Sequence, residues 1–213
     1  MGARRVSFLD RLIGEIDKAI KVLSAPIHPG RPLSGAGGGD SMLAEAERAE
    51  SCRLMRVNHS GEVAAQALYQ GQAQWARTAA VADALRRAAA EEIDHLAWCE
   101  TRLHELNGRT SLLNPLWYAG SFAIGALAGA CGDRLSLGFI AETERQVEAH
   151  LNGHRERLPA ADHRSRAIVE QMTQDEVAHG AKARSMGADE LPFPLQMAMR
   201  LTSRVMTRSS YWV

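Results

Sequence analysis

The sequence contains few aromatic residues and few cysteines. Phe, Trp and Tyr make up 5% of the 213 residues. No useful length of chain alternates between apolar and polar residues, so we expect no β-sheet. The cysteines Cys52, Cys99 and Cys131 are far apart and odd in number. They form no disulfide framework, which fits a reducing compartment.

The chain also lacks an excess of either charge. Lys and Arg number 25, and so do Asp and Glu, so no overall field favours a nucleic-acid partner. A secretory signal is not expected, because Asp10, Glu15 and Asp17 interrupt the apolar residues near the start. The length suits one domain, or one domain with appendages.

Ala, Leu, Glu and Arg are abundant and favour helices, and the apolar residues recur with helical spacing. This pattern predicts an all-α fold with a bundle of four long helices. Their expected ranges are about 42–77, 82–106, 133–157 and 161–185. An apolar crossover helix is expected at about 116–131, and a final helix at about 195–208.

We expect the chain to divide into three parts. Residues 1–24 contain an amphipathic helix whose apolar stripe either packs on the bundle or contacts lipid. Residues 25–40 form a linker rich in Pro and Gly. Residues 41–213 form the bundle together with a C-terminal amphipathic helix. Asp40 or Ser41 is expected to cap the first long helix.

The motif Glu-x-x-His occurs twice, and a further glutamate precedes the two copies by 30 and 32 residues. One such motif alone is weak evidence. The repeated pattern consists of Glu62, Glu92, His95, Glu144, Glu176 and His179. In each motif the Glu and His are three residues apart, so both project from one face of a helix.

The midpoints of these two sets fall near residues 78 and 161, where the helices are expected to turn. Two antiparallel hairpins would therefore bring all six side chains to one level of a four-helix bundle. Within each helix the six follow the apolar seam. Nearby acidic residues are expected outside the seam, namely Glu91, Asp94, Glu142 and Asp175.

A cluster of buried carboxylates needs partners, because an unpaired buried charge costs roughly several kcal/mol. Two divalent cations would offset four glutamates, and two histidines would add neutral nitrogen ligands. Mixed carboxylate and imidazole ligation with open positions suits iron or manganese better than structural zinc. The six residues are therefore predicted to hold a dinuclear metal centre.

Several short strings resemble those of one protein family. They are Arg56-Val-Asn-His-Ser-Gly-Glu62, Tyr69-Gln-Gly-Gln72, Glu92-Ile-Asp-His95, Asn114-Pro-Leu-Trp117, Glu144 with His150 and Asn152 downstream, and Asp175-Glu-Val-Ala-His179. Over roughly residues 42–213 the chain resembles the demethoxyubiquinone hydroxylase family of ferritin-like di-iron proteins, in its longer bacterial form.

The resemblance implies a ferritin-like fold and two iron ions. The family's iron ligands carry over onto Glu62, Glu92, His95, Glu144, Glu176 and His179, with the glutamates of the two motifs as bridging carboxylates. His150 matches a histidine that members use near the centre. Leu151 stands where a tyrosine is expected beside it, so the role of that pair stays open.

The implied reaction is hydroxylation of the ring of a polyprenyl demethoxyubiquinol with O2, a late step of ubiquinone biosynthesis. The electron donor is either the quinol or a reductase. A homo-oligomer and an assembly with other quinone-biosynthesis proteins both remain open. The alternative function is a ferritin-like ferroxidase that stores iron. A di-iron hydroxylase for a modified tRNA base is a third reading, disfavoured because no broad basic patch is present.

A polyprenyl substrate lies in the bilayer, so we expect peripheral attachment to the cytoplasmic face of the cell membrane. Residues 110–132 carry no charge, which suits a buried crossover, a helix embedded at the bilayer surface or, least well, a full span. Arg200, Arg204 and Arg208 form one basic face near terminal aromatics. Such a helix either lies on anionic lipid or packs on the bundle.

Overall fold

The computed structural model describes residues 8–24, 27–33 and 43–213 of the chain. This part of the chain is all-helical, as predicted, and has no strand. Its helices are α1 (Phe8–Ser24), α2 (Glu45–Trp75), α3 (Ala79–Glu105), α4 (Asn114–Ala130), α5 (Asp133–Arg157), α6 (His163–Ser185) and α7 (Phe193–Trp212). The cap expected at Asp40 or Ser41 lies outside the described residues.

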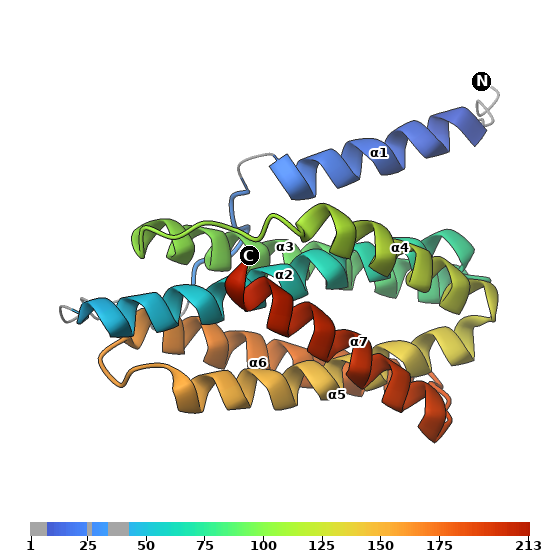
Figure 1. Ribbon diagram of the computed structural model, residues 1–213. Coiled ribbons are helices and arrows are strands. Elements are labelled where there is room, and N and C mark those ends of the chain that lie inside the picture. Colours follow the sequence, from blue (N-terminus) through green and yellow to red (C-terminus); the bar gives the residue numbers. More distant parts are fainter. Residues whose placement is uncertain (1–7, 25–26, 34–42) are drawn as a thin grey trace.

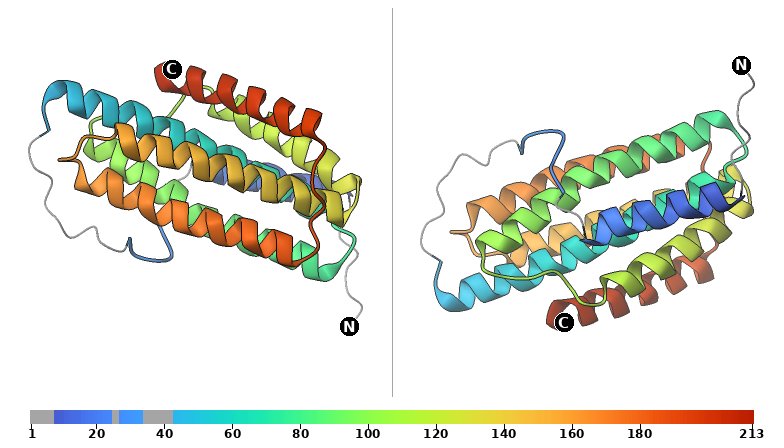
Figure 2. Two further views of the ribbon diagram at one scale, coloured as in Figure 1. Left: turned by 90° about the horizontal axis from the view of Figure 1, so that it is seen from below. Right: turned by 90° about the horizontal axis from the view of Figure 1, so that it is seen from above.

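Helices α2, α3, α5 and α6 form the bundle as two antiparallel hairpins (Figures 1 and 2). The hairpins turn between Trp75 and Ala79 and between Arg157 and His163, close to the predicted midpoints. Helix α4 connects the hairpins and packs along α2, while α7 returns across α2 and α5 (Figure 2). The predicted arrangement of hairpins is therefore confirmed.

Polar caps fix the two hairpin turns. Thr78 caps α3, since its side chain accepts a hydrogen bond from the amide of Val81. Asp133, at the start of α5, accepts hydrogen bonds from the amides of Arg77 and Thr78 at 2.8 and 3.0 Å. The first turn is thereby joined to the second hairpin. Asp162 caps α6 by accepting from the amide of Ser165.

Two apolar clusters fill the bundle at different levels. One contains Leu54, Met55, Trp98, Cys99, Leu103, Leu151, Ile168, Val169 and Met172. The other contains Tyr69, Val81, Leu85, Leu137, Ile140 and Ala183. Along each of the four bundle helices, the residues of the repeated motif lie between the residues of the first cluster and those of the second. The predicted helical register is confirmed, because the seam residues on all four helices are buried or half-buried.

Helix α4 contacts α2 backbone to backbone. A Cβ at Gly125 would lie 2.2 Å from the Leu68 carbonyl oxygen, and one at Gly71 would lie 2.3 Å from that of Phe122. The outer face of α4 is exposed at Leu116 and Leu127. The crossover is therefore half-buried: of the alternatives for this segment, burial applies to the face against α2 and not to the outer face. Among the described helices, none combines the length and apolarity needed to cross a membrane.

The described part of the predicted linker, residues 27–33, lies against the bundle. His28 is exposed, as expected for a loop residue. Arg31, however, forms ion pairs with Asp94 of α3 and Asp175 of α6. A segment that the sequence marks only as a connection therefore contacts two bundle helices.

Candidate metal centre

All six residues of the repeated motif meet inside the bundle. Glu62 comes from α2 and Glu144 from α5, while α3 and α6 each contribute a Glu-x-x-His pair. The four glutamates and His95 are at most 3% exposed. His179 is half-buried. Helical spacing and hairpin symmetry were sufficient to predict this convergence.

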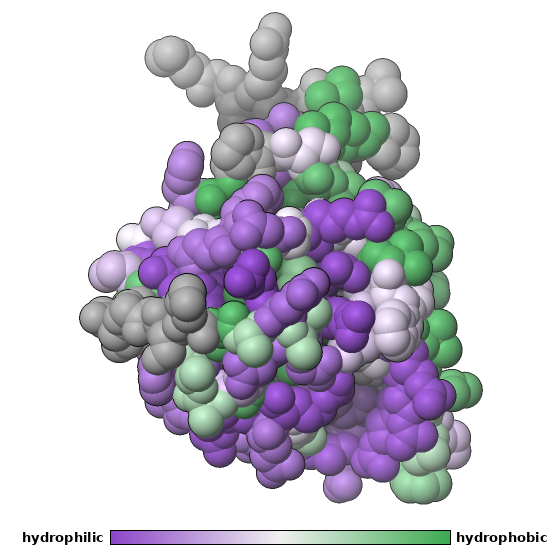
Figure 3. All heavy atoms as spheres, turned by 60° about the vertical axis from the view of Figure 1, so that its left-hand side comes forward, coloured by the Kyte–Doolittle hydropathy of each residue, from purple (hydrophilic) through white to green (hydrophobic). Residues whose placement is uncertain are grey.

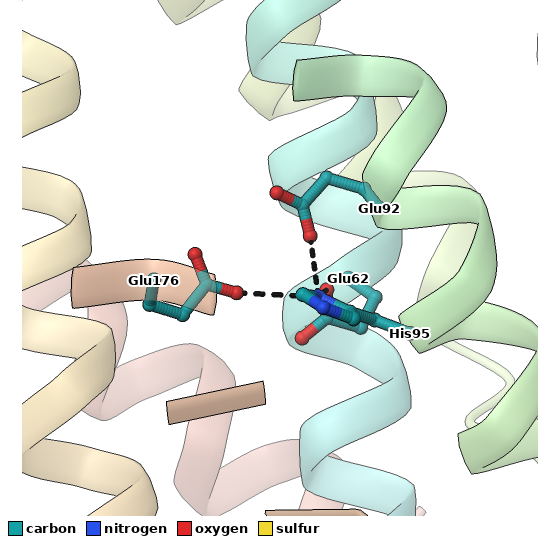
Figure 4. Close-up of side chains that lie close together, drawn as sticks. All are labelled: Glu62, Glu92, His95 and Glu176. Atoms are coloured by element: carbon teal, nitrogen blue, oxygen red, sulfur yellow. Dashed lines mark hydrogen bonds and ion pairs between the residues drawn. The ribbon is translucent and has the colours of Figure 1, made fainter. Parts of the chain in front are cut away.

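The ligand-type atoms fall into two groups, each with all its atoms within 4.8 Å of one another. One group is Glu62, Glu92, His95 and Glu176, and the other is Glu144, Glu176 and His179. The side chains of the first group point toward one another (Figure 4). Glu176 belongs to both groups, so the two positions are adjacent.

Glu92 and Glu176 each direct one oxygen to each histidine. His95 Nδ1 lies 2.9 Å from Glu92 Oε2 and 3.3 Å from Glu176 Oε1. His179 Nδ1 lies 3.2 Å from the other oxygen of Glu92 and 3.3 Å from the other oxygen of Glu176. Two carboxylates placed between two imidazoles in this way can bridge a pair of cations.

Burial and charge oppose one another in the cluster. Burial raises the pKa of Glu62 and Glu144 well above the usual carboxyl value, and neighbouring carboxylates add to this. Burial acts on Glu92 in the same direction, but the two histidines outweigh it and lower its pKa. Burial lowers the pKa of both histidines, but the glutamates raise it overall, for His179 to about 12. Divalent cations would replace the bound protons.

The donor set fits such cations. Glu62 Oε2 and Glu92 Oε1 are buried and accept no hydrogen bond within the described part of the chain. The nearest histidine nitrogens are 3.5 and 3.2 Å away but not in hydrogen-bonding geometry. Buried carboxylate oxygens without hydrogen bonds are costly unless a cation binds them. Carboxylate and imidazole together suit iron or manganese.

Two acidic residues predicted to lie outside the seam contact the histidines of the centre, and a third contacts Arg31. His95 Nε2 lies 2.8 Å from Asp175 Oδ2, and His179 Nε2 lies 2.6 Å from Glu91 Oε2. Asp94 is buried and holds Arg31. A position outside the seam does not exclude these contacts, because a residue beside a helical seam can reach the neighbouring helix. An acidic residue directly precedes the glutamate of each Glu-x-x-His motif, and this repeated feature of the sequence could have indicated a contact with the opposite histidine.

Tyr69 of α2 donates a hydrogen bond from its hydroxyl group to Glu144. The tyrosine is buried, and burial together with nearby carboxylates raises its pKa well above the usual value. It therefore remains a neutral donor and fixes the orientation of the Glu144 carboxylate. The apolar pattern of the sequence correctly placed Tyr69 on the face of its helix that points into the bundle. It did not predict the hydrogen bond to Glu144.

His150 lies on α5 with its ring 3.9 Å from the ring of His154. Burial, together with the positive charge of Arg157, lowers the pKa of His150 to about 4. Leu151 packs in the apolar cluster with Met172, so it provides no hydroxyl in place of the expected tyrosine. The suggested role of His150 near the metals stays a prediction.

The family strings around residues 58–60 and 114–117 contact one another. Asn114, the first residue of α4, lies 2.8 Å from the hydroxyl of Ser60 and 3.2 Å from Nδ1 of His59. Asn58 accepts a hydrogen bond from His154 of α5 at 2.7 Å. These residues attach α4 and α5 to the stretch of α2 that carries Glu62.

Sulfur atoms lie in the apolar cluster that packs against the centre. The thiol of Cys99 is 3.8 Å from the sulfur of Met172. Burial, with the charge of Glu62, raises the pKa of the Cys99 thiol well above its usual value. The cysteine is therefore a neutral thiol.

A cavity of about 380 Å³ lies beside His179. Helices α3, α5 and α6 form most of its lining, with apolar walls that include Leu85, Leu137, Ile140 and Met186. The charged residues Arg87 and Lys182 are also in its lining and are exposed. Its size and apolar lining are typical of a small-molecule site.

The fold and the cluster define a class, the ferritin-like helical bundles. A solved structure titled "A Dodecameric Thioferritin in the Bacterial Domain, Characterization of the Bacterioferritin-Related Protein from Bacteroides fragilis" has a similar fold, with a TM-score of 0.56. The two sequences are 16% identical, and the match covers 79% of this chain and 91% of that chain. This likeness concerns the fold alone.

Within that class the chain belongs to the family described as "Ubiquinone biosynthesis protein COQ7", whose family model matches residues 49–210. Relatives named 3-demethoxyubiquinol 3-hydroxylase are 57% identical in Nitrosospira multiformis and 56% identical in Chromobacterium violaceum. Both matches cover 96% of this chain and 99% or more of the relative. The resemblance inferred from the short strings is confirmed.

Proposed function

We propose that this chain is a 3-demethoxyubiquinol 3-hydroxylase, a di-iron monooxygenase of ubiquinone biosynthesis. The observation that carries the proposal is the placement of Glu92 and Glu176 between the two histidines. The nearly full-length relatives with that name support the reaction. No finding supports the alternative of an iron-storing ferroxidase.

The six motif residues would hold two iron ions. When bound, the metals supply the redox chemistry with O2 that ring hydroxylation requires. The residues of the chain fix the positions of the ligands and exclude water from them. Tyr69 holds the Glu144 carboxylate in place through its hydrogen bond. The apolar clusters on either side limit the contact of the site with water, which strengthens the electrostatic contacts in it.

The cavity beside His179 is the proposed entry for the quinol ring. Its walls are apolar, and it reaches from exposed residues of α3 and α6 to His179 and Tyr69. A substituted aromatic ring fits within a volume of this order. The basic side chains Arg87 and Lys182 can hydrogen-bond to ring oxygens at its rim.

The proposed reaction predicts a specific product. The purified chain would be loaded anaerobically with Fe(II), mixed with a short-chain demethoxyubiquinol and exposed to ¹⁸O2. We expect hydroxylated quinol carrying one ¹⁸O atom, detected by mass spectrometry. Oxidised iron without any labelled quinol would contradict the hydroxylase and favour the ferroxidase. Comparison of repeated turnover with and without an added reductase would show whether the quinol or the reductase is the electron donor.

We further propose that the chain attaches peripherally to the cytoplasmic face of the cell membrane. Apolar side chains are exposed on the three helices that pack outside the bundle against α2, and many gather along one edge in Figure 3. They include Ile13, Ile16 and Ile20 of α1, Leu116 and Leu127 of α4, and Leu201 and Val205 of α7. Arg204 and Arg208 on α7 are exposed and can contact anionic headgroups.

Not every aromatic residue at the C-terminus supports this attachment. Tyr211 donates a hydrogen bond to Glu50, and the guanidinium groups of Arg53 and Arg157 lie 5.5 and 5.3 Å from its ring centre. It is held on the bundle, as the packing alternative predicted. Trp212 is 69% exposed and remains available to lipid.

Membrane attachment predicts sedimentation with vesicles that contain anionic lipid, and weaker sedimentation with purely zwitterionic vesicles. A Leu201→Asp/Val205→Asp variant should sediment at least about 10-fold less. Burial of these two apolar side chains in lipid would contribute roughly 3 kcal/mol or more to the free energy of membrane binding. Glu190→Gln, which changes an exposed residue before α7, is the control. Equal exclusion of all three proteins from anionic vesicles would refute the attachment.

A further inference from the structure

The two histidines of the centre are supported from opposite helices in a reciprocal way. His95 of α3 contacts Asp175, the residue before the motif glutamate of α6. His179 of α6 contacts Glu91, the residue before the motif glutamate of α3. In both cases the outer nitrogen Nε2 faces the acidic residue, while Nδ1 faces the bridging glutamates.

The acidic contacts favour a proton on the outer nitrogen Nε2 of each ring. When Nε2–H donates to the carboxylate, Nδ1 carries the lone pair that faces the centre. A hydrogen bond of this kind orients a metal-binding imidazole and makes it a better ligand. Glu91 and Asp175 are therefore positioned to act on the metals through the histidines, without touching the metals themselves.

The two supports differ in how firmly they are held. The Asp175 carboxylate is 16% exposed and accepts hydrogen bonds from Arg31 and from Gln171, the latter at 3.1 Å. The side chain of Glu91 is 54% exposed. Its only partner among the described residues is His179. The support of His95 is thus held by several contacts, and the support of His179 is more exposed and has fewer contacts.

Arg31 contributes to this difference together with Gln171, and its Nη2 also lies 3.4 Å from His95 Nε2. Its Nε lies 2.9 Å from Asp94 Oδ2, and its guanidinium group lies 5.1 Å from the centre of the Trp98 ring. The amide of the adjacent Gly30 also donates to Asp94, at 2.6 Å. A planar guanidinium held by two carboxylates and an aromatic ring has little freedom to move.

We propose that Arg31 is a positioning residue that fixes His95 through Asp175, so that residues 27–33 make one of the two metal positions tighter than the other. The inference rests on the proposed di-iron function. The tighter position is the one formed by Glu62, Glu92, His95 and Glu176. The position at His179, which borders the cavity, keeps an adjustable support in Glu91.

The test is anaerobic titration of the full chain with Co(II), which reports each bound ion by its visible absorption. Binding at two positions of unequal affinity is expected for the unaltered chain. Asp175→Asn and Arg31→Ala should weaken the tighter position about 10- to 100-fold, the usual effect of losing such a partner. Glu91→Gln should weaken only the other position.

Three comparisons make the result decisive. Arg155→Ala removes an exposed ion pair with Glu170 that includes none of the six motif residues, and should leave both affinities unchanged. The double variant Arg31→Ala/Asp175→Asn should bind no more weakly than Asp175→Asn alone, because Arg31 acts through Asp175. The metal-free Arg31→Ala protein should retain the thermal midpoint of the Arg155→Ala control, which excludes general destabilisation.

The outcomes separate the inference from the proposed function. Two-site binding by the unaltered chain, with the same two affinities in Arg31→Ala, would overturn the role of Arg31 and leave the di-iron function intact. Equal weakening of both positions would also overturn it. Failure of the unaltered chain to bind two ions would overturn the proposed function and the inference together.

Discussion

Replacement of Glu176 by alanine is expected to reduce the iron content from two ions per chain to one or none and to abolish hydroxylation. Glu176 is the residue shared by both groups of ligand-type atoms. Loss of an outer partner of a metal ligand already costs roughly 10- to 100-fold in affinity or activity, so loss of a shared ligand should exceed 100-fold. Metal analysis and product formation measure the two effects.

The metal-free variant should nevertheless remain folded. Glu176 raises the pKa of Glu62 and Glu144 through charge repulsion, so its removal relieves a conflict among buried carboxylates. Glu170→Ala, on the exposed face of the same helix, is the matched control and should load two ions. If Glu176→Ala binds two ions with unchanged affinity, the proposed ligand set is wrong.

Replacement of Arg102 by methionine is expected to reduce the free energy of unfolding by roughly 3–5 kcal/mol. Arg102 of α3 is 2% exposed and donates hydrogen bonds to Asp162 and Ser165 at 2.8 and 2.9 Å. Asp162 is fully buried and caps α6. Methionine fills much of the space but leaves that carboxylate without its cation. Urea denaturation of the metal-free protein measures the loss.

The control for this prediction is again an arginine in an ion pair. Arg155 and Glu170 form a pair whose side chains are 43% and 48% exposed. Exposed pairs contribute about 0–1 kcal/mol, so Arg155→Ala should change the free energy of unfolding little. A loss below about 1 kcal/mol for Arg102→Met would show that the buried pair does not hold the second hairpin to the first.

Much of the fold followed from periodicity in the sequence. The apolar stripes predicted the helices. The near-equal spacing of Glu62 to Glu92 and of Glu144 to Glu176 predicted the hairpins. The third long helix was predicted at 133–157 and is observed at Asp133–Arg157. Convergence of six polar residues on one level was predictable because helical rise and hairpin symmetry determine it.

The contacts around the centre were less predictable, because they depend on side chains that cross between elements. Nothing in the Pro- and Gly-rich segment distinguishes Arg31 from an ordinary loop arginine. The bond between Tyr69 and Glu144 joins residues 75 positions apart. Exposure of the outer face of α4 depends on which helix covers it. The division of the chain at residues 24 and 40, and the metal-binding role of the six residues, stay predictions.

The position of Cys99 and Met172 has a consequence for the working lifetime of the protein. An oxygen-using centre can damage nearby sulfur atoms, and thiolates react far faster than thiols. Burial raises the pKa of the Cys99 thiol well above its usual value, so this sulfur, in the same α3 seam as His95, is in its less reactive protonated form. With the proposed di-iron function, enclosure in an apolar cluster would protect Cys99 from oxidation at the centre, so that oxidative inactivation should begin at other residues.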